Sequence, residues 1–358
     1  KNNKTAMIIS SVESLNQYVV AFLIFTSTPE SVFKNPSSPV LWAFVVLGLL
    51  GAIAGNIRSI ALSTLVTFLI PEGERDKANG MVGTINGVSF LVASDLSGLE
   101  ICYLGMFWLI PIHEKGIVHT EEDTKRIDIR GTIRVLNRMP GLFALIFFNT
   151  FNNFLGGVFM SLMDAYGLAL VSVQTWGILW GVLSGGFIIG GLVVAKKGLG
   201  KRPLRTLFIT NVVLWTVCVF FTIQASIVLL AVGMFIYMCL VPVVEAAEQT
   251  IMQKLVPPER QGRVFGFAQS IEQAASPLTA FMIGPIAELV FIPFMTTGAG
   301  VQLIGGWFGT GSDRGLALVF TVTGLIGLIV TVLAMQSRSY HLLATNYEQK
   351  MAEETVNE

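Results

Sequence analysis

The sequence contains little charge. Only 13% of its 358 residues are Asp, Glu, Lys or Arg, whereas 53% are hydrophobic, and the mean hydropathy is +0.69. A soluble domain usually carries about 25% charged residues, because it must cover its surface with them. The apolar residues also occur in runs long enough to cross a membrane. The composition excludes an ordinary soluble domain and predicts an all-α integral membrane protein.

Other absences narrow the chemistry. Basic and acidic residues balance at 23 each, so the net charge indicates no nucleic-acid partner. No CxxC or Cys/His spacing is present, and we expect the three cysteines to be buried packing thiols rather than disulfides or metal ligands. The GLGKR stretch at Gly198 lacks the upstream Gly and the Ser/Thr of a phosphate-binding loop. We therefore expect no cofactor and no metal, and we expect that the protein's activity is not driven by ATP hydrolysis.

Ten segments have the length and composition of membrane-spanning helices, which need about 20 mostly apolar residues. They are residues 6–25, 40–69, 78–98, 99–112, 142–163, 171–194, 207–223, 227–255, 264–294 and 315–335. The fourth is the weakest, because about 14 residues reach roughly 21 Å of a hydrocarbon core of ~30 Å.

The basic residues predict how these spans are oriented. Residues 195–205 (AKKGLGKRPLR) contain five basic residues and no acidic one, so we expect this loop to face the cytoplasm. The loops at 26–38 and 296–313 contain almost no Lys or Arg. An even number of crossings then places both ends of the sequence in the cytoplasm, in a multi-pass protein of the cell membrane.

Two segments of the chain resemble each other. LIPEGERDKANG at 69–80 aligns without gaps with LVPPERQGRVFG at 255–266. Both follow one long apolar segment and open another. Internal repeats of this kind are typical of secondary transporters. The matched pairs are Pro71 with Pro257, Lys77 with Arg263, and Gly80 with Gly266.

These residues resemble the major facilitator superfamily, whose members have two six-helix halves around a central cavity. VPPERQGRVFGFAQSIEQAASP at 256–277 is similar to the loop and helix that join the family's tenth and eleventh spans. IPEGERDKANGMVGTINGVSF at 70–90 is similar to the matching place in the first half. The branch it resembles most is the drug:proton antiporters, with macrolide-efflux-type proteins and siderophore exporters. The resemblance implies that the loop motifs, with Arg260 added to the six matched residues, act in the conformational change.

Two departures from the family pattern are visible. The resemblance begins at the family's third span, so the first two spans are missing from this sequence, and the sixth is shortened after Trp108. Ala195 also occupies the usual acidic position of a motif in the second half. We expect four parts: 1–112, an incomplete N-terminal half-bundle of family spans 3–6; 113–140, a cytoplasmic linker; 141–338, the C-terminal half-bundle of spans 7–12; and 339–358, a cytoplasmic tail.

Charged side chains inside apolar spans cost roughly 3 kcal/mol on insertion scales, so each is a candidate functional residue. Glu245 lies 12 residues before Pro257, which corresponds to about 18 Å along a helix and a place near the midplane. Arg58 lies 13 residues before Pro71, at a matching depth on another span. Glu248 shares the helix face of Glu245.

The resemblance implies that these spans line a central cavity, to which the seventh family span adds asparagines including Asn153. The candidate coupling and substrate residues are Glu245, Glu248, Arg58, Asn149, Asn152 and Asn56. In such a cavity a carboxylate takes and releases a proton, and Arg58 pairs with it or tunes it. The alternative is structural: an ion pair or hydrogen bonds that lock the helices together. For Glu13, Asn16, Asp95, Glu272 and Glu288 we expect structural hydrogen bonding.

The function implied by the resemblance is multidrug efflux: a secondary transporter, not an enzyme, that exports small hydrophobic molecules by proton antiport with alternating access. Its expected partners are the substrate, protons and the lipid bilayer, and we expect a monomer. Export of a siderophore or another metabolite is the alternative within transport. A membrane-embedded enzyme and a truncated relative without transport activity are the alternatives from other classes.

Overall fold

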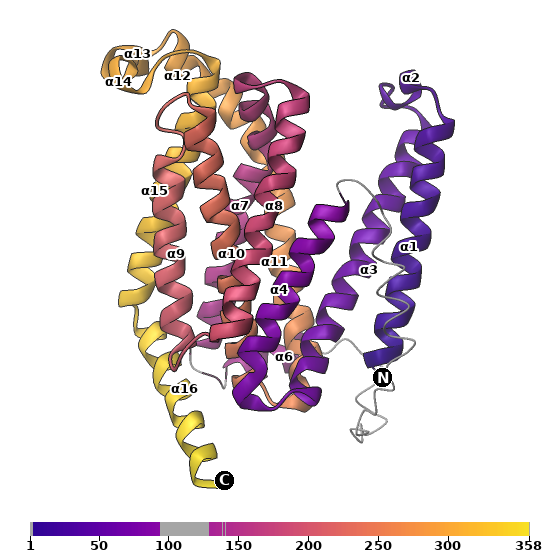
Figure 1. The fold of residues 1–358 in the computed structure, drawn as a ribbon, viewed down its shortest axis with the longest axis vertical. Coiled ribbons are helices and arrows are strands. Elements are labelled where there is room, and N and C mark those ends of the chain that lie inside the picture. Colours follow the sequence, from indigo (N-terminus) through magenta and orange to yellow (C-terminus); the bar gives the residue numbers. More distant parts are fainter. Residues whose placement is uncertain (1–2, 94–128, 138, 140, 358) are drawn as a thin grey trace.

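The structure is a computed structural model that describes residues 3–93, 129–137, 139 and 141–357. Within these ranges all regular elements are helices (Figure 1). The predicted span at 99–112, Asp95 and most of the predicted linker at 113–140 lie outside the described residues.

The helices follow one another along the chain, mostly with short connections. They are α1 (Asn3–Ser27), α2 (Glu30–Phe33), α3 (Pro39–Leu69), η1 (Glu72–Glu74), α4 (Arg75–Ala93), α6 (Ile129–Asn137), α7 (Leu142–Leu170), α8 (Val173–Lys197), α9 (Pro203–Phe220), α10 (Ile227–Leu255), α11 (Pro258–Ile286), the π-helix η3 (Ala287–Phe291), α12 (Ile292–Thr296), α13 (Ala299–Leu303), α14 (Gly305–Phe308), α15 (Ser312–Gln336) and α16 (Arg338–Asn357).

Eight helices in the described ranges are long and apolar enough to cross a membrane, and they correspond to eight of the ten predicted spans. They are α1, α3, α7, α8, α9, α10, the continuous run of α11, η3 and α12, and α15. A ninth predicted span, 78–98, is represented by α4, and its remainder lies outside the described part. The prediction of an all-helical, multi-pass architecture is confirmed.

Two predicted span boundaries were wrong by six or more residues, each for a local reason. The span predicted to end at Met163 continues as helix to Leu170, because the Asp164 carboxylate accepts hydrogen bonds from two indoles and does not break the helix. The span predicted to begin at Val264 begins at Pro258. Proline is well suited to the first helical position, where its missing N–H is not needed.

The long helices run alternately between two ends of the molecule (Figure 1). One end, called the α16 end here, contains α16, η1 and the turns at 198–202 and 256–257. The other, called the α2 end, contains α2 and α12 to α14. The two repeated segments therefore lie at the same end. The basic loop at 195–205 lies there as well.

The helices form two groups of unequal size. α1 and α3 pack together as a hairpin to one side, and α3 reaches α10 and α11 near its lower end (Figure 1). α7 to α11 and α15 form the larger bundle, which holds most of the buried side chains. α4 packs on α8 and α10 of this bundle. The free thiols Cys218 and Cys239 lie in the larger bundle, the first buried and the second half-buried.

Glycine allows α4 to approach α8 closely. A Cβ atom on Gly80 would lie 2.6 Å from the backbone nitrogen of Ala195, so any larger residue would push the two helices apart. Gly191 meets the backbone of Thr84 from the other side in the same way. Gly266, which occupies the matching place in the second repeat, has only Ile60 near it, at 3.9 Å. The two copies of the repeat therefore serve different packing needs.

Candidate functional site

A cavity of about 270 Å³ lies where α3, α4, α7, α10 and α11 meet. Most of the side chains that line it are polar. They are Ser59, Ser63, Asn79, Asn86, Asn153, Glu245, Glu248, Gln249, Gln269, Glu272 and Gln273. Because polar side chains are costly in a membrane interior, such a concentration on five different helices favours a functional cavity over packing alone.

Three carboxyl groups line this polar cavity. Glu245 and Glu248 lie on the same face of α10, and Glu272 faces them from α11. Glu245 is exposed to the open space of the cavity, whereas Glu272 is only 7% exposed. The side chain of Glu248 interacts with those of Glu272 and Asn149. Two carboxyl groups in contact can share one proton, so the arrangement can hold and release protons.

No Lys, Arg or His is present among the described residues that line the polar cavity. The lining is completed by amide and hydroxyl groups, some of which bond across helices. Gln269 on α11, for example, donates a hydrogen bond from Nε2 to the Ser59 hydroxyl on α3 at 3.1 Å. The cavity is therefore an acidic and hydrogen-bonding environment, suited to a proton or to a cationic or polar part of a solute.

Side-chain amides join three helices on the α16 side of the polar cavity. Asn79 on α4 donates from Nδ2 to the Thr250 hydroxyl at 2.9 Å and to Oε1 of Gln253 at 3.0 Å, both on α10. Gln253 in turn donates from Nε2 to the backbone oxygen of Ser63 on α3 at 2.9 Å. These bonds connect α3 and α4, from the first part of the chain, to α10 from the second.

Charged groups add a second set of links closer to the α16 end. Oδ2 of Asp76 accepts a hydrogen bond from the backbone N–H of Leu199 at 2.8 Å. Glu72 forms ion pairs with Lys254 and with Arg75, each at 3.0 Å. Burial lowers the pKa of Arg75, and the neighbouring Glu72 carboxylate opposes this shift. The contacts of Asp76 and Glu72 hold the loop of the first repeat against the α8–α9 turn and against the C-terminus of α10.

Helix α16 packs against the same end. Lys350 donates from Nζ to the backbone oxygens of Lys254 and Leu255, at 3.2 and 3.0 Å, and so satisfies carbonyls at the C-terminus of α10. Burial, together with the negative charges of Asp76 and Glu72, raises the pKa of Tyr347 to about 12. Its phenol therefore stays protonated at physiological pH.

The structure places the predicted cavity residues in three different settings. Glu245, Glu248 and Asn153 line the polar cavity. Asn149 is buried beside Glu248. Asn152 lies outside the described lining, and its Oδ1 accepts a 2.7 Å hydrogen bond from the Trp215 indole, which joins α7 to α9.

The two predicted cavity residues on α3, Arg58 and Asn56, are not among the described lining residues either. Ser59, which follows Arg58 directly, does line the cavity.

The predicted loop-motif residues cluster at the α16 end. Pro71 and Pro257 precede η1 and α11 as their N-caps. Gly80 is buried against α8. Lys77 is exposed, and Arg260 and Arg263 are half-buried. Cross-links between helices at this end come from neighbours of these residues, Glu72, Asp76 and Lys254.

The sequence reasoning underrated or missed several groups. The prediction placed Glu272 close to the first residue of its span, because that span was predicted to begin at Val264. With α11 beginning at Pro258, Glu272 lies 14 residues into the helix, or about 21 Å along it, close to the depth of Glu245. Nothing in the sequence distinguishes Asn79 and Gln253, except that both are amides near a repeated segment. Asp76 could have been noticed because it is acidic, whereas the loop that it contacts has Ala195 at the position where the family usually has an acidic residue.

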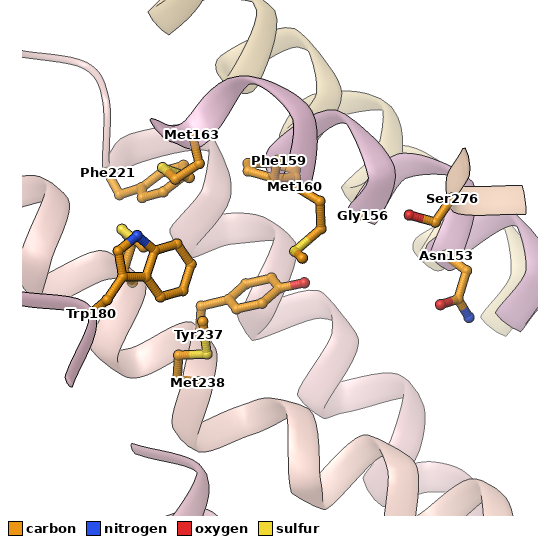
Figure 2. A pocket seen from close by; sticks show the side chains of 11 residues that line it. Asn153, Gly156, Phe159, Met160, Met163, Trp180, Phe221, Tyr237, Met238 and Ser276 are labelled. Atoms are coloured by element: carbon orange, nitrogen blue, oxygen red, sulfur yellow. The ribbon is translucent and has the colours of Figure 1, made fainter. Parts of the chain in front are cut away.

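A second pocket, of about 180 Å³, lies closer to the α2 end between α7, α8 and α10. Aromatic and methionine side chains dominate its walls, as Figure 2 shows, and we call it the aromatic pocket. They are Phe159, Met160, Met163, Trp180, Phe221, Met234, Tyr237 and Met238. Asn153 and Ser276 supply polar groups, and Asn153 also lines the polar cavity. The two spaces therefore adjoin at this residue.

The described ranges contain eight candidate spans, four of which line a polar cavity together with α4, and these features define a multi-pass helical membrane protein. Residues 17–280 match the Major Facilitator Superfamily. The chain therefore belongs to this superfamily of transporters, as the loop motifs indicated. Its membership indicates a carrier of small molecules rather than an enzyme.

Three solved structures have a similar fold. The human organic anion transporter MFSD10 (TETRAN) is 13% identical with a TM-score of 0.58, and the match covers 92% of this chain and 77% of that one. A bacterial homologue of the iron transporter ferroportin, in an outward-facing state, is 13% identical with a TM-score of 0.59, covering 94% and 84%. The proton:xylose symporter XylE is 13% identical with a TM-score of 0.55, covering 92% and 80%.

Identities this low show the fold alone. No curated protein matches the sequence.

Proposed function

We propose that this protein is a proton-driven exporter of hydrophobic small molecules in the cell membrane. The observation that carries the proposal is the group of three carboxyls, Glu245, Glu248 and Glu272, in one polar cavity that adjoins an aromatic pocket. A proton-coupled carrier needs a group that binds a proton when the cavity faces one side and releases it when it faces the other. Glu245 meets this need best, because it is exposed to the cavity.

The roles of the other groups follow from their contacts. Glu248 and Glu272 hold a second proton between them, beside the buried side chain of Asn149. Arg58 adjusts the electrostatic potential from α3, one residue away from the lining at Ser59. Substrate occupies the aromatic pocket and extends to Asn153, where it competes with protonation of the carboxyls. Export, rather than uptake, follows from the resemblance to drug:proton antiporters.

The bonds at the α16 end form the gate of this carrier. The links from Asn79 to Gln253 and from Asp76 to Leu199 join the two parts of the chain on that side of the cavity. Alternating access requires these bonds to break while the α2 end closes.

The basic loop at 195–205 makes the α16 end the cytoplasmic one. A single cysteine at Gly198 should then be protected from impermeant thiol reagents in intact cells, while one at Gly300 should react. The reverse pattern would contradict the orientation.

Export of a polar metabolite, such as a siderophore, is the second candidate. The observation that favours it is the number of amides in the polar cavity, Asn79, Asn86, Asn153, Gln249, Gln269 and Gln273. Amides offer paired donors and acceptors that suit a substrate rich in hydrogen-bonding groups. The two candidates differ in which pocket provides most of the binding energy.

Purified protein in liposomes tests the proposal. A panel of hydrophobic drugs and polar metabolites is offered with and without an imposed pH gradient, and accumulation against the substrate gradient is measured. We expect accumulation of at least one hydrophobic compound that depends on the pH gradient and disappears with a protonophore. Accumulation confined to polar metabolites would favour the second candidate. Accumulation insensitive to the protonophore would refute proton coupling.

A further inference from the structure

Asp164 is the charged residue of α7 that the mechanism above does not use. It lies six residues before the end of α7 at Leu170, or about 9 Å along the helix. Its Oδ1 accepts hydrogen bonds from two indoles of α8, from Trp176 Nε1 at 2.9 Å and from Trp180 Nε1 at 3.3 Å. One carboxylate oxygen therefore holds two large aromatic side chains of the neighbouring helix.

The two tryptophans differ in how tightly they are packed. Trp176 is 5% exposed and lies directly against Gly167, where a side chain would collide with its ring. Trp180 meets Trp176 edge-on, with ring centroids 5.9 Å apart. Trp176 is thus fixed by burial, whereas the half-buried Trp180 contacts Trp176 on one side and donates from its N–H to the exposed Asp164 carboxylate.

Trp180 is the member of this group that reaches a pocket. Its ring forms part of the wall of the aromatic pocket, together with Tyr237, Met163 and Phe221. Figure 2 shows the indole of Trp180 beside the ring of Tyr237, with Asn153 and Ser276 at the far end of the pocket. Asp164 is not among the lining residues, so it acts on the pocket only through Trp180.

We propose that Asp164 is a positioning residue that fixes Trp180 as a wall of the aromatic pocket and thereby gives the carrier a preference for substrates with an aromatic ring. The inference rests on the proposed function in one respect, that the aromatic pocket receives substrate. A ring stacks on a neighbouring aromatic face only if that face is held at a defined angle. An indole that is free to turn about its side-chain bonds loses this geometry. The three carboxyls of the adjoining cavity make a cationic aromatic compound the suitable ligand class.

The alternative is a purely structural role. Tryptophans near the ends of membrane helices commonly anchor a protein at the lipid–water interface. In that case Asp164 would contribute to the stability of the α7–α8 hairpin and would leave ligand preference unchanged.

Equilibrium binding to the purified protein separates the two roles. The probes are tetraphenylphosphonium and tetrabutylphosphonium, which carry the same charge and differ in their rings. We expect the wild-type protein to bind the aromatic cation more tightly. Asp164→Leu should reduce that preference by roughly tenfold, the size expected when a hydrogen bond to a charged group is lost. Asp164→Asn, which keeps an acceptor oxygen, should restore most of the preference.

A second variant keeps the test valid if Asp164→Leu folds poorly. Trp180→Phe keeps a ring but has no N–H to bond, so it should reduce the preference in the same way. Replacing Asp164 in the Trp180→Phe background should then cause little further change. Thermal unfolding of each variant reports stability separately.

Three results would overturn the inference. They are no aromatic preference in the wild-type protein, an unchanged preference in Asp164→Leu despite lower stability, and additive effects of the two substitutions. Binding requires no proton gradient, so a protein that binds selectively but does not pump would refute the proposed function and support this inference.

Discussion

The polar cavity and the aromatic pocket lie next to each other but are built from opposite kinds of side chain. The first is lined by carboxyls, amides and hydroxyls from five helices, two of them, α3 and α4, from the first part of the chain. The second is lined mainly by aromatic rings and methionines of α7, α8 and α10. Asn153 belongs to both. In the proposed function this difference separates two tasks: protons bind where the two parts of the chain meet, and hydrophobic substrate binds within one of them.

The largest expected effect comes from removing a proton-binding group from the polar cavity. Glu245→Gln keeps the size and hydrogen bonding of the side chain but cannot titrate. We expect loss of pH-driven accumulation in liposomes, while equilibrium binding in the aromatic pocket is weakened but retained, because Gln mimics the protonated carboxyl with which substrate competes. Glu288→Gln in η3, which is outside the described lining of both pockets, is the matched control. Normal pumping by Glu245→Gln would transfer the coupling role to Glu248 or Glu272.

A substitution in the aromatic pocket should weaken substrate binding and leave coupling to the pH gradient intact. Tyr237→Leu preserves apolar volume but removes a ring from the wall. We expect binding of an aromatic substrate to weaken by about threefold to tenfold, as for the loss of one aromatic pair, with the dependence on the pH gradient retained. The measurement is transport into liposomes, in which KM and the maximal rate are determined separately with and without the pH gradient. If coupling and affinity fall together, the two spaces act as a single site.

The smallest effect on transport is expected at Asn152, which joins α7 to α9 through the Trp215 indole. In Asn152→Leu the indole N–H loses its acceptor in a buried place, at a cost of about 1–3 kcal/mol of stability. Thermal unfolding in detergent should show the loss, and Trp215→Phe in the same background should recover part of it. Transport per folded molecule should change little. A strong transport defect without a stability change would instead support the predicted role of Asn152 in substrate binding or coupling.

Much of the fold could be predicted because the membrane imposes simple rules. A helix must satisfy its own backbone hydrogen bonds in lipid, so long apolar runs predict spans almost directly. The matching of eight candidate spans to predicted segments follows from this rule. Boundaries were less predictable where a charge such as Asp164 is accommodated by partners on another helix. Depth along the helix and the family resemblance predicted that Glu245 and Glu248 lie at a cavity, and both residues do line the polar cavity. Asn79 and Gln253 could not be predicted, because their bonds depend on what lies across from them.

The sequence by itself determined that the chain is a multi-pass helical protein and that acidic groups lie deep in α10. Each depends on composition or on spacing along one helix. Only the tertiary structure decided that Gly80 is tightly packed while Gly266 is not, and that Glu272 joins Glu248. It also decided that Asp76 reaches Leu199 and that Asn152 bonds to Trp215. Helix-to-helix contacts of this kind depend on the rotation and approach of whole helices, which no local pattern of residues specifies.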